Sequence, residues 1–135
     1  MSDGQKPNLD LIRMVQQARM AHDAQAVPSQ IAAVYWIEAK APDAALPTAR
    51  AGEWLIVTDT QRVDALWARI KAATENGQLG YKSKVATAAH GTDTHAREIR
   101  VCTIDADDSP DVRRVEAALR ALGYDGPIRY RRAAQ

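Results

Sequence analysis

A periodic run of apolar residues between positions 63 and 73 most constrains the fold of this chain. The run consists of Val63, Leu66, Trp67, Ile70 and Ala73. These residues fall at i, i+3, i+4, i+7 and i+10, which is the spacing of one face of an α-helix. Asp59 or Thr60 is expected to cap this helix, and Gly77 stands where a left-handed C-cap belongs.

A second helix and five strands are expected around this run. Ser109 is the expected N-cap of the second helix, Pro110 its first residue and Gly123 its end. Short stretches with alternating or β-branched residues indicate strands over residues 32–39, 53–58, 82–88, 97–105 and 127–132. Trp36, Trp54 and Trp67 are expected to pack in the core, since Phe is absent.

The order of these elements predicts an α+β fold. With an amphipathic helix over residues 9–25, the order is α-β-β-α-β-β-α-β. We expect a single antiparallel sheet of five to six strands, two helices on one face and the N-terminal helix in addition. The chain is expected to form one domain over 1–135, with a helical extension over 1–30 and an α+β core over 31–132. From 53 to 132 the order is that of a ferredoxin-like split unit, which hosts many functions.

Composition excludes several classes of protein. Lys and Arg number 18 against 17 Asp and Glu, which argues against a strongly basic nucleic-acid binder. One Cys excludes a disulfide framework and fits a reducing cytoplasm. We find no apolar run of membrane-spanning length, no signal-peptide core, no nucleotide-cofactor motif and no metal-ligand spacing. We therefore expect a cytoplasmic protein that binds no cofactor, no metal and no membrane.

Cationic residues on the later strands are the strongest functional signal. Lys82 and Lys84 alternate and point to one face, Arg97 and Arg100 flank the start of the next strand, and Arg129 lies on the last strand. If these strands are neighbours, the cations converge on the sheet and can hold a phosphate. A solvated face balanced by carboxylates such as Glu53, Glu98 and Asp105 is the alternative.

Two further features of the sequence bear on function. The tail over residues 129–132, which reads Arg-Tyr-Arg-Arg, also suits single-stranded nucleic acid, because an aromatic ring between cations can stack on a base. Cys102 lies in the middle of an expected strand, where a small buried residue is the usual role of a lone Cys.

Several segments in order resemble one family. The pieces are GEWL, VDALW, NGQLG, SKVAT, IRVCTID and DVRRVEAALRALG, and together they span about 100 residues. This pattern resembles the uncharacterised family whose eukaryotic member is the basophilic-leukaemia-expressed protein. The resemblance implies the fold of the cap-binding translation initiation factor, an antiparallel sheet backed by helices. The resemblance extends to bacterial relatives of that protein, which are described as phosphothreonine-lyase-like.

The resemblance to lyases implies that some residues of the site hold the phosphate and that others carry out the proton transfers. Such enzymes use a Lys as base, a His as acid and further cations to hold the phosphate. Lys84 matches the lysine of the phosphate-holding strand, and Arg97 or Arg100 is the candidate for the arginine. The catalytic Lys-x-His is replaced here by Glu53-Trp54-Leu55. The resemblance therefore implies a phosphate pocket without its usual acid and base.

Three hypotheses follow from the sequence. The first is a module that binds a phosphopeptide, a nucleotide or an RNA end through Lys82, Lys84, Arg97, Arg100 and Arg129. The second is a phosphothreonine-lyase-like enzyme, with Lys84 or Lys82 as base and His90 or His95 as acid. The third is a protein-interaction domain or homo-oligomer that associates through the N-terminal helix.

Overall fold

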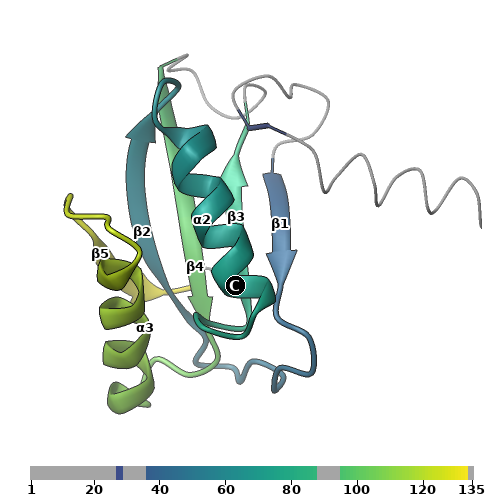
Figure 1. Ribbon diagram of the computed structural model, residues 1–135. Helices are drawn as coiled ribbons and strands as arrows, with labels where there is room; N and C mark the ends of the chain where they lie inside the picture. The colour runs from purple at the N-terminus through teal and green to yellow at the C-terminus, as the bar shows by residue number, and fades with distance from the viewer. Residues whose placement is uncertain (1–26, 29–35, 88–94, 134–135) are drawn as a thin grey trace, which may run out of the picture.

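The computed structural model describes residues 27–28, 36–87 and 95–133. Strand β1 (Trp36–Lys40) is followed by β2 (Gly52–Asp59) and helix α2 (Val63–Glu75). Strands β3 (Lys82–Ala86) and β4 (Ala96–Thr103), helix α3 (Ser109–Ala121) and strand β5 (Arg129–Arg132) complete the order (Figure 1). The expected helix over 9–25 lies outside the described residues, as do positions 32–35 of the first expected strand.

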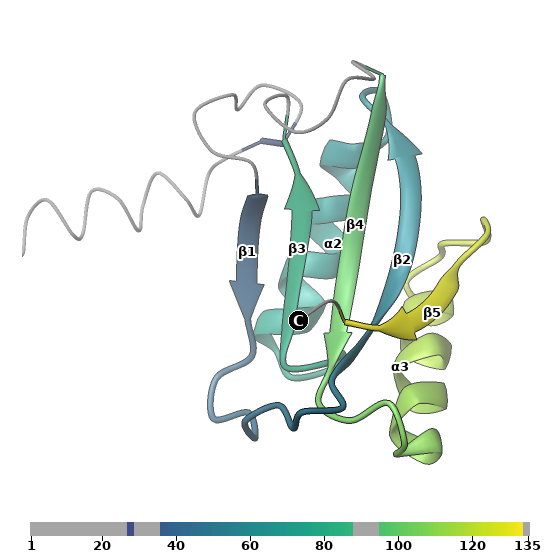
Figure 2. The same ribbon diagram turned by 180° about the vertical axis from the view of Figure 1, so that it is seen from behind.

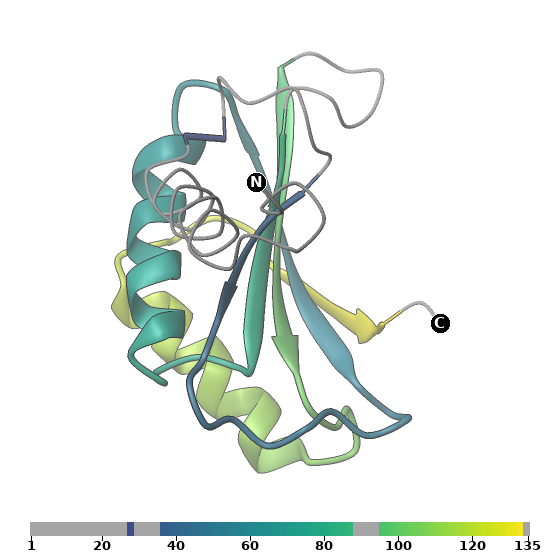
Figure 3. The ribbon, with the colours of Figure 1, turned by 90° about the vertical axis from the view of Figure 1, so that its right-hand side faces the viewer.

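The five strands form one antiparallel sheet in the order β1-β3-β4-β2-β5. Helix α2 joins β2 to β3, and β4 lies between these two strands. Helix α3 joins β4 to β5, with β2 between them. This arrangement is the split β-α-β unit that the element order predicts, with β1 added at the β3 edge. Both helices cover the same face of the sheet (Figure 3).

The core lies between this face and the helices. All five residues of the apolar run at 63–73 are buried there. From the sheet, alternate residues such as Ile56, Ile99 and Val101 point into the same cluster. Trp54 adds a hydrogen bond, because its indole Nε1 donates to the Val112 carbonyl of α3 at 3.0 Å. The predicted α+β fold with two helices on one face is thereby confirmed.

Several element ends differ from the sequence prediction; for example, β3 ends at Ala86 instead of residue 88 and β4 at Thr103 instead of residue 105. Asp108, rather than Ser109, caps α3, because its carboxylate accepts the Asp111 amide at 3.3 Å. The N-cap of α2 is Arg62 without a side-chain cap, although Asp59 accepts the Gln61 and Arg62 amides just before it. Strand β5 begins at Arg129 instead of residue 127. The predicted left-handed conformation of Gly77 is confirmed, with φ of 75°, and Gly123, the predicted end of the second helix, has a positive φ of 97°.

Candidate functional site

The sheet face away from α2 and α3 carries the candidate site. Residues that lie opposite each other in neighbouring strands point to the same side, and successive residues alternate. Since Ile37, Val85 and Ile99 face the core, the residues next to them face away from it. No described helix covers this side, which we call the open face (Figure 2).

Two rows of paired residues cross the open face. The first row runs Glu38, Lys84, Arg100, Leu55 and Arg129 through the five strands in order. The second row, one pleat further along, runs Lys40, Lys82, Cys102, Glu53 and Arg131. These rows bring six of the chain's basic side chains onto one side of the sheet, together with the carboxylates of Glu38 and Glu53.

Lys82, Lys84 and Arg100 are direct neighbours, and we call them the basic cluster. Lys84 lies opposite Arg100 in the β3–β4 register, and Lys82 is two residues from Lys84 on the same strand. Neighbours of both kinds are separated by about 5–7 Å between Cα atoms. Three long cationic side chains at this spacing can converge on one phosphate group.

Arg100 is held in place from one side of its guanidinium. Its Nε donates to the Glu98 carboxylate at 2.8 Å and lies 3.5 Å from Glu53. Glu53 is 3% exposed and also accepts from Arg131 at 3.0 Å. Within the described residues, no partner engages the two terminal nitrogens of Arg100. The carboxylates therefore orient Arg100 through its Nε, and in the described part of the chain its terminal donors carry no ion pair.

Trp36 organises the other end of the cluster. The Lys84 Nζ lies 4.8 Å from the centre of the Trp36 ring, and the Arg100 Cζ lies 4.7 Å from it. Such contacts between a cation and an indole face stabilise the position of both cations. Trp36 is therefore a half-buried residue of the open face, whereas the prediction of core packing is confirmed for Trp54 and Trp67.

The lysines of the cluster are loosely paired. Lys82 Nζ lies 4.0 Å from Glu38 and 5.7 Å from the Tyr81 ring. No carboxylate within the described residues forms an ion pair with Lys84. A pair at 4.0 Å contributes little in a half-exposed setting, so both ammonium groups can turn towards an anionic ligand.

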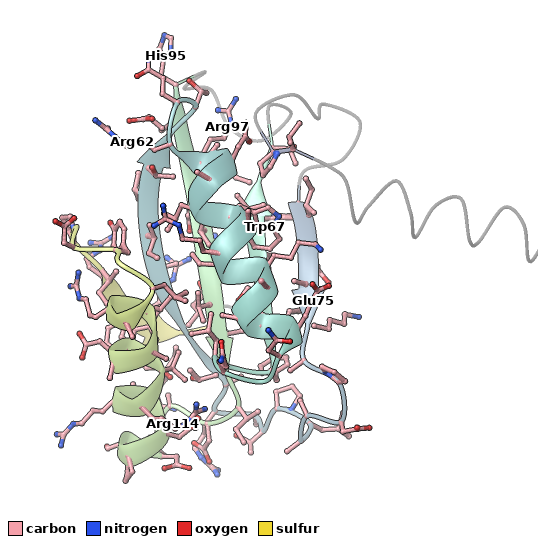
Figure 4. The ribbon with its side chains drawn as sticks, in the orientation of Figure 1. Arg62, Trp67, Glu75, His95, Arg97 and Arg114 are labelled. Carbon is pink, nitrogen blue, oxygen red and sulfur yellow. The ribbon has the colours of Figure 1, made fainter. Side chains whose placement is uncertain are left out.

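The other predicted cations lie elsewhere. Arg129 is on the open face but two strands from Arg100, which is about 10 Å across the sheet. Arg97 lies on the helix-covered face, 4% exposed, with its Nη1 donating to the Ala96 carbonyl at 2.8 Å (Figure 4). The two arginines at 97 and 100 are three residues apart, so strand alternation places them on opposite faces. The predicted convergence of Arg97 with the other cations is therefore wrong.

His95, one of the two candidate acids of the lyase hypothesis, is not near the cluster. His95 is exposed next to the first residue of β4, where Figure 4 shows it at the end of the sheet. It is five residues from Arg100 along an extended strand, a separation of about 17 Å. His90 lies outside the described residues.

Cys102 lies between Lys82 and Glu53 in the second row. Its side chain is buried, and burial raises the pKa of the thiol above its ordinary value. A buried, protonated thiol is a poor nucleophile, which agrees with the structural role expected from the sequence. In the described part of the chain, no three His, Cys, Asp or Glu side chains gather to hold a metal ion. No described helix is long and apolar enough to cross a membrane.

Sequence reasoning missed the part played by Trp36. It named Glu53 and Glu98 as carboxylates that balance the cations, and both pair with Arg100 on the open face. Trp36 alternates with Ile37 and shares its side of β1 with Glu38, so strand alternation could have placed it on the open face. The burial of Glu53 needed the pairing of β2 with both β4 and β5, which are far apart in the sequence.

Comparison with known proteins gave a family and several solved structures. The family model described as "Basophilic leukemia-expressed protein Bles03" matches residues 11–132. A structure of Ascaris suum eIF4E-3 with an m2,2,7G cap is 23% identical, with a TM-score of 0.48, over 60% of this chain and 49% of that chain. A complex of C. elegans eIF4E-3 with the 4E-binding protein Mextli and a cap analog is 23% identical, with a TM-score of 0.49, over 61% and 50%. The chain thus spans about half the length of these structures. A search of curated proteins gave no match.

Proposed function

This chain belongs to the Bles03 family, as its sequence motifs predicted, and from that premise we propose that its open face binds a phosphorylated ligand. The binding site would be the basic cluster of Lys82, Lys84 and Arg100. The phosphate would lie over these three side chains, with Arg100 offering its two terminal nitrogens and each lysine an ammonium group.

The fixed orientation of Arg100 is the observation that carries this proposal. A guanidinium that is free in solution loses side-chain entropy when it binds an anion. Arg100 has already lost much of that freedom, since Glu98 and Glu53 hold its Nε and its Cζ lies 4.7 Å from the centre of the Trp36 ring. A preorganised donor beside two loosely paired lysines favours binding of a phosphate over a purely solvated face.

Binding without catalysis is the form of the function that we propose. A lyase needs a proton donor beside the departing phosphate. His95 is about 17 Å along β4 from Arg100, which is too far to serve a phosphate held at the cluster. Strand β2 contains Glu53, Trp54 and Leu55 at the positions where the resemblance to lyases implies a Lys-x-His.

Ligand binding to purified protein tests the proposal. The panel contains phosphopeptides, mononucleotides, capped and uncapped RNA ends, and inorganic phosphate. A ligand at about 100 times its Kd adds roughly 2.7 kcal/mol to the free energy of unfolding and raises the Tm measurably. We expect a Tm rise with at least one organic phosphate, and a smaller one with inorganic phosphate at equal concentration.

Two double variants with the same change in net charge distinguish binding by the basic cluster from a general effect of positive charge. Lys82→Gln/Lys84→Gln removes two ammonium groups from the open face and leaves the Glu53–Arg100 contact in place. Lys71→Gln/Arg113→Gln removes two positive charges from α2 and α3. We expect the first pair to weaken binding by at least about tenfold, because each charge-assisted hydrogen bond contributes about 1.5–3 kcal/mol. Equal affinity of the two double variants, or no Tm rise across the panel, would show that the face is merely solvated.

A further inference from the structure

Strand β2 extends beyond its neighbour β5. It contains residues 52–59, but β5 pairs with its first four residues, from Gly52↔Arg132 to Leu55↔Arg129. The Ala133 amide donates to the Ala51 carbonyl at 2.9 Å, so the backbone of residue 51 faces β5. In an antiparallel sheet the backbone N–H and C=O groups of every second residue point to the same neighbouring strand, so those of Leu55 and Val57 also point to the β5 side.

Pro127 explains why the pairing stops. Continuing the register places Pro127 opposite Val57, and proline has no N–H to donate to the Val57 carbonyl. In the described part of the chain, neither the amide nor the carbonyl of Val57 has a hydrogen-bond partner on this edge. The Val57 side chain is 65% exposed on the open face. The β2 edge is therefore unpaired at Val57, whereas the Asp59 carbonyl beyond it accepts the Arg62 amide at 3.2 Å.

A hollow lies on each side of this edge. On the helix side, a cleft of about 700 Å³ separates β2 and α2 from the loop over residues 123–126, with Ala65, Leu66 and Tyr124 among its lining residues. On the open face, a hollow of about 220 Å³ is lined by Leu55, Val57, Glu98, Pro127, Arg129 and Arg131, and its one carboxylate, that of Glu98, pairs with Arg100 at 2.8 Å. Val57 borders both, so alternate side chains of an added strand would enter the two hollows in turn.

Each hollow also presents an arginine without a carboxylate partner in the described residues. Arg69 lines the helix-side cleft and touches the Leu122 carbonyl at 3.4 Å. Arg129 lines the open-face hollow and lies apart from the basic cluster. In the cleft, Arg62 and Asp59 neutralise each other at 2.6 Å, and Asp125 lies on the exposed loop. Figure 4 shows Arg62 at this upper end of β2.

From these contacts we propose that the β2 edge at Val57 binds an extended segment of a partner protein in which acidic residues alternate with apolar ones. The main chain of the segment pairs with the Val57 amide and carbonyl, as in β-strand addition. Because alternate side chains of a strand point to opposite faces, the acidic side chains of the segment lie on the open-face side towards Arg129, and its apolar side chains enter the helix-side cleft beside Ala65, Leu66 and Tyr124.

A second copy of this chain does not fit the edge. Antiparallel pairing of two β2 strands about Val57 would place the copy's Asp59 opposite Leu55, where Arg129 of β5 already pairs. The partner therefore has to be a narrow, extended segment that ends or turns before β5. This site is separate from the basic cluster, so its test does not depend on phosphate binding.

Three capped octapeptides provide the probes. They alternate Val with Glu, with Ser or with Lys, and each carries a fluorophore for polarisation measurements. We expect the Glu/Val peptide to bind at least about tenfold more tightly than the Ser/Val peptide and the Lys/Val peptide to bind weakest, because the flanking charges are cationic. The preference should shrink at high salt. No binding of the Glu/Val peptide, or equal binding of the three, overturns the proposal.

A protein variant tests which edge binds the peptide, and N-methylated peptides test the backbone pairing. Arg129→Gln should weaken Glu/Val binding at least about tenfold, whereas Arg113→Gln, which removes the same charge from α3, should not. N-methylation of alternate residues should abolish binding in one of the two possible patterns only, since one set of amides faces β2. The Val57 amide should gain protection from hydrogen exchange in the complex. Binding that tolerates both methylation patterns, or leaves Val57 unprotected, contradicts strand addition.

Discussion

Glu53 and Arg131 lie opposite each other in the β2–β5 register, and both Nε and Nη2 of Arg131 lie 3.0 Å from one Glu53 carboxylate oxygen. Glu53 is 3% exposed, and Arg131 covers it from the open face. The pair joins strands that are 78 residues apart in the sequence. A carboxylate buried this deeply requires its cationic partners, because an unpaired buried charge is strongly unfavourable.

Loss of the Glu53 charge should destabilise the fold. We expect Glu53→Gln to lower the free energy of unfolding by about 1–3 kcal/mol, because Arg131 and Arg100 both lose a charged acceptor. Urea unfolding measures the change. Asp107→Asn, which breaks the exposed Arg132–Asp107 pair, is the control and should change stability by less than about 1 kcal/mol. Equal effects of the two substitutions would contradict a structural role for the buried pair.

The fold followed from local patterns, whereas the site depended on long-range pairing. The apolar spacing over 63–73 predicted α2, because a helix buries one face with a 3.6-residue period. Lys82, Lys84 and Arg100 were predicted to share the open face, and the register agrees. Arg97 was misplaced because alternation along β4 was not carried through. The burial of Glu53 and the open edge at Val57 depend on where β5 pairs, which no local pattern encodes.

Gly80 and Gly77 should respond differently to substitution by Ala. A Cβ on Gly80 would overlap the Cys102 carbonyl of β4, whereas a Cβ on Gly77 meets nothing within 4 Å. Gly80→Ala therefore has to displace backbone, at a cost of about 1–3 kcal/mol or more. An alanine at position 77 would have to adopt the left-handed conformation at φ 75°, which destabilises the fold by about 1–2 kcal/mol. We expect the lower urea midpoint for Gly80→Ala, and the reverse order would contradict the close packing of residue 80 on β4.

Stability should fall in alkaline solution as Tyr130 ionises. Burial raises the pKa of Tyr130 above its ordinary value of 10.0, although a 2.6 Å hydrogen bond with Thr103 partly offsets this. Because the native state holds this proton more tightly than the unfolded state, stability is retained below pH 10 and lost as the pH rises towards the native pKa. Tyr130→Phe should show a smaller decrease in Tm between pH 9.5 and 11 than the wild type. An unchanged slope in that range would contradict a contribution from Tyr130, and the raised pKa values of Tyr81 and Tyr124 would account for the remaining decrease.

The link between Arg50 and Asp105 should make the fold sensitive to acid. Arg50 donates to both Asp105 oxygens, at 3.0 and 2.7 Å, and joins the segment between β1 and β2 to the end of β4. The hydrogen bond from Arg50 lowers the pKa of Asp105 below its ordinary value of 3.8. Because the native state binds this proton more weakly than the unfolded state, the contribution is present above about pH 4 and is lost as the pH falls through the native pKa.

Arg50→Gln tests this acid dependence. The variant should be less stable than the wild type at pH 6, and the difference between them should narrow as the pH falls from 5 to 2, because protonation of Asp105 removes the same interaction from the wild type. Thermal unfolding across that range provides the measurement. Arg62→Gln, whose partner Asp59 shows a similar 2.6 Å contact within one turn of chain, is the control for a local ion pair. A difference between Arg50→Gln and the wild type that stays constant down to pH 2 would show that packing of the Arg50 side chain, rather than its charge, holds the segment to β4.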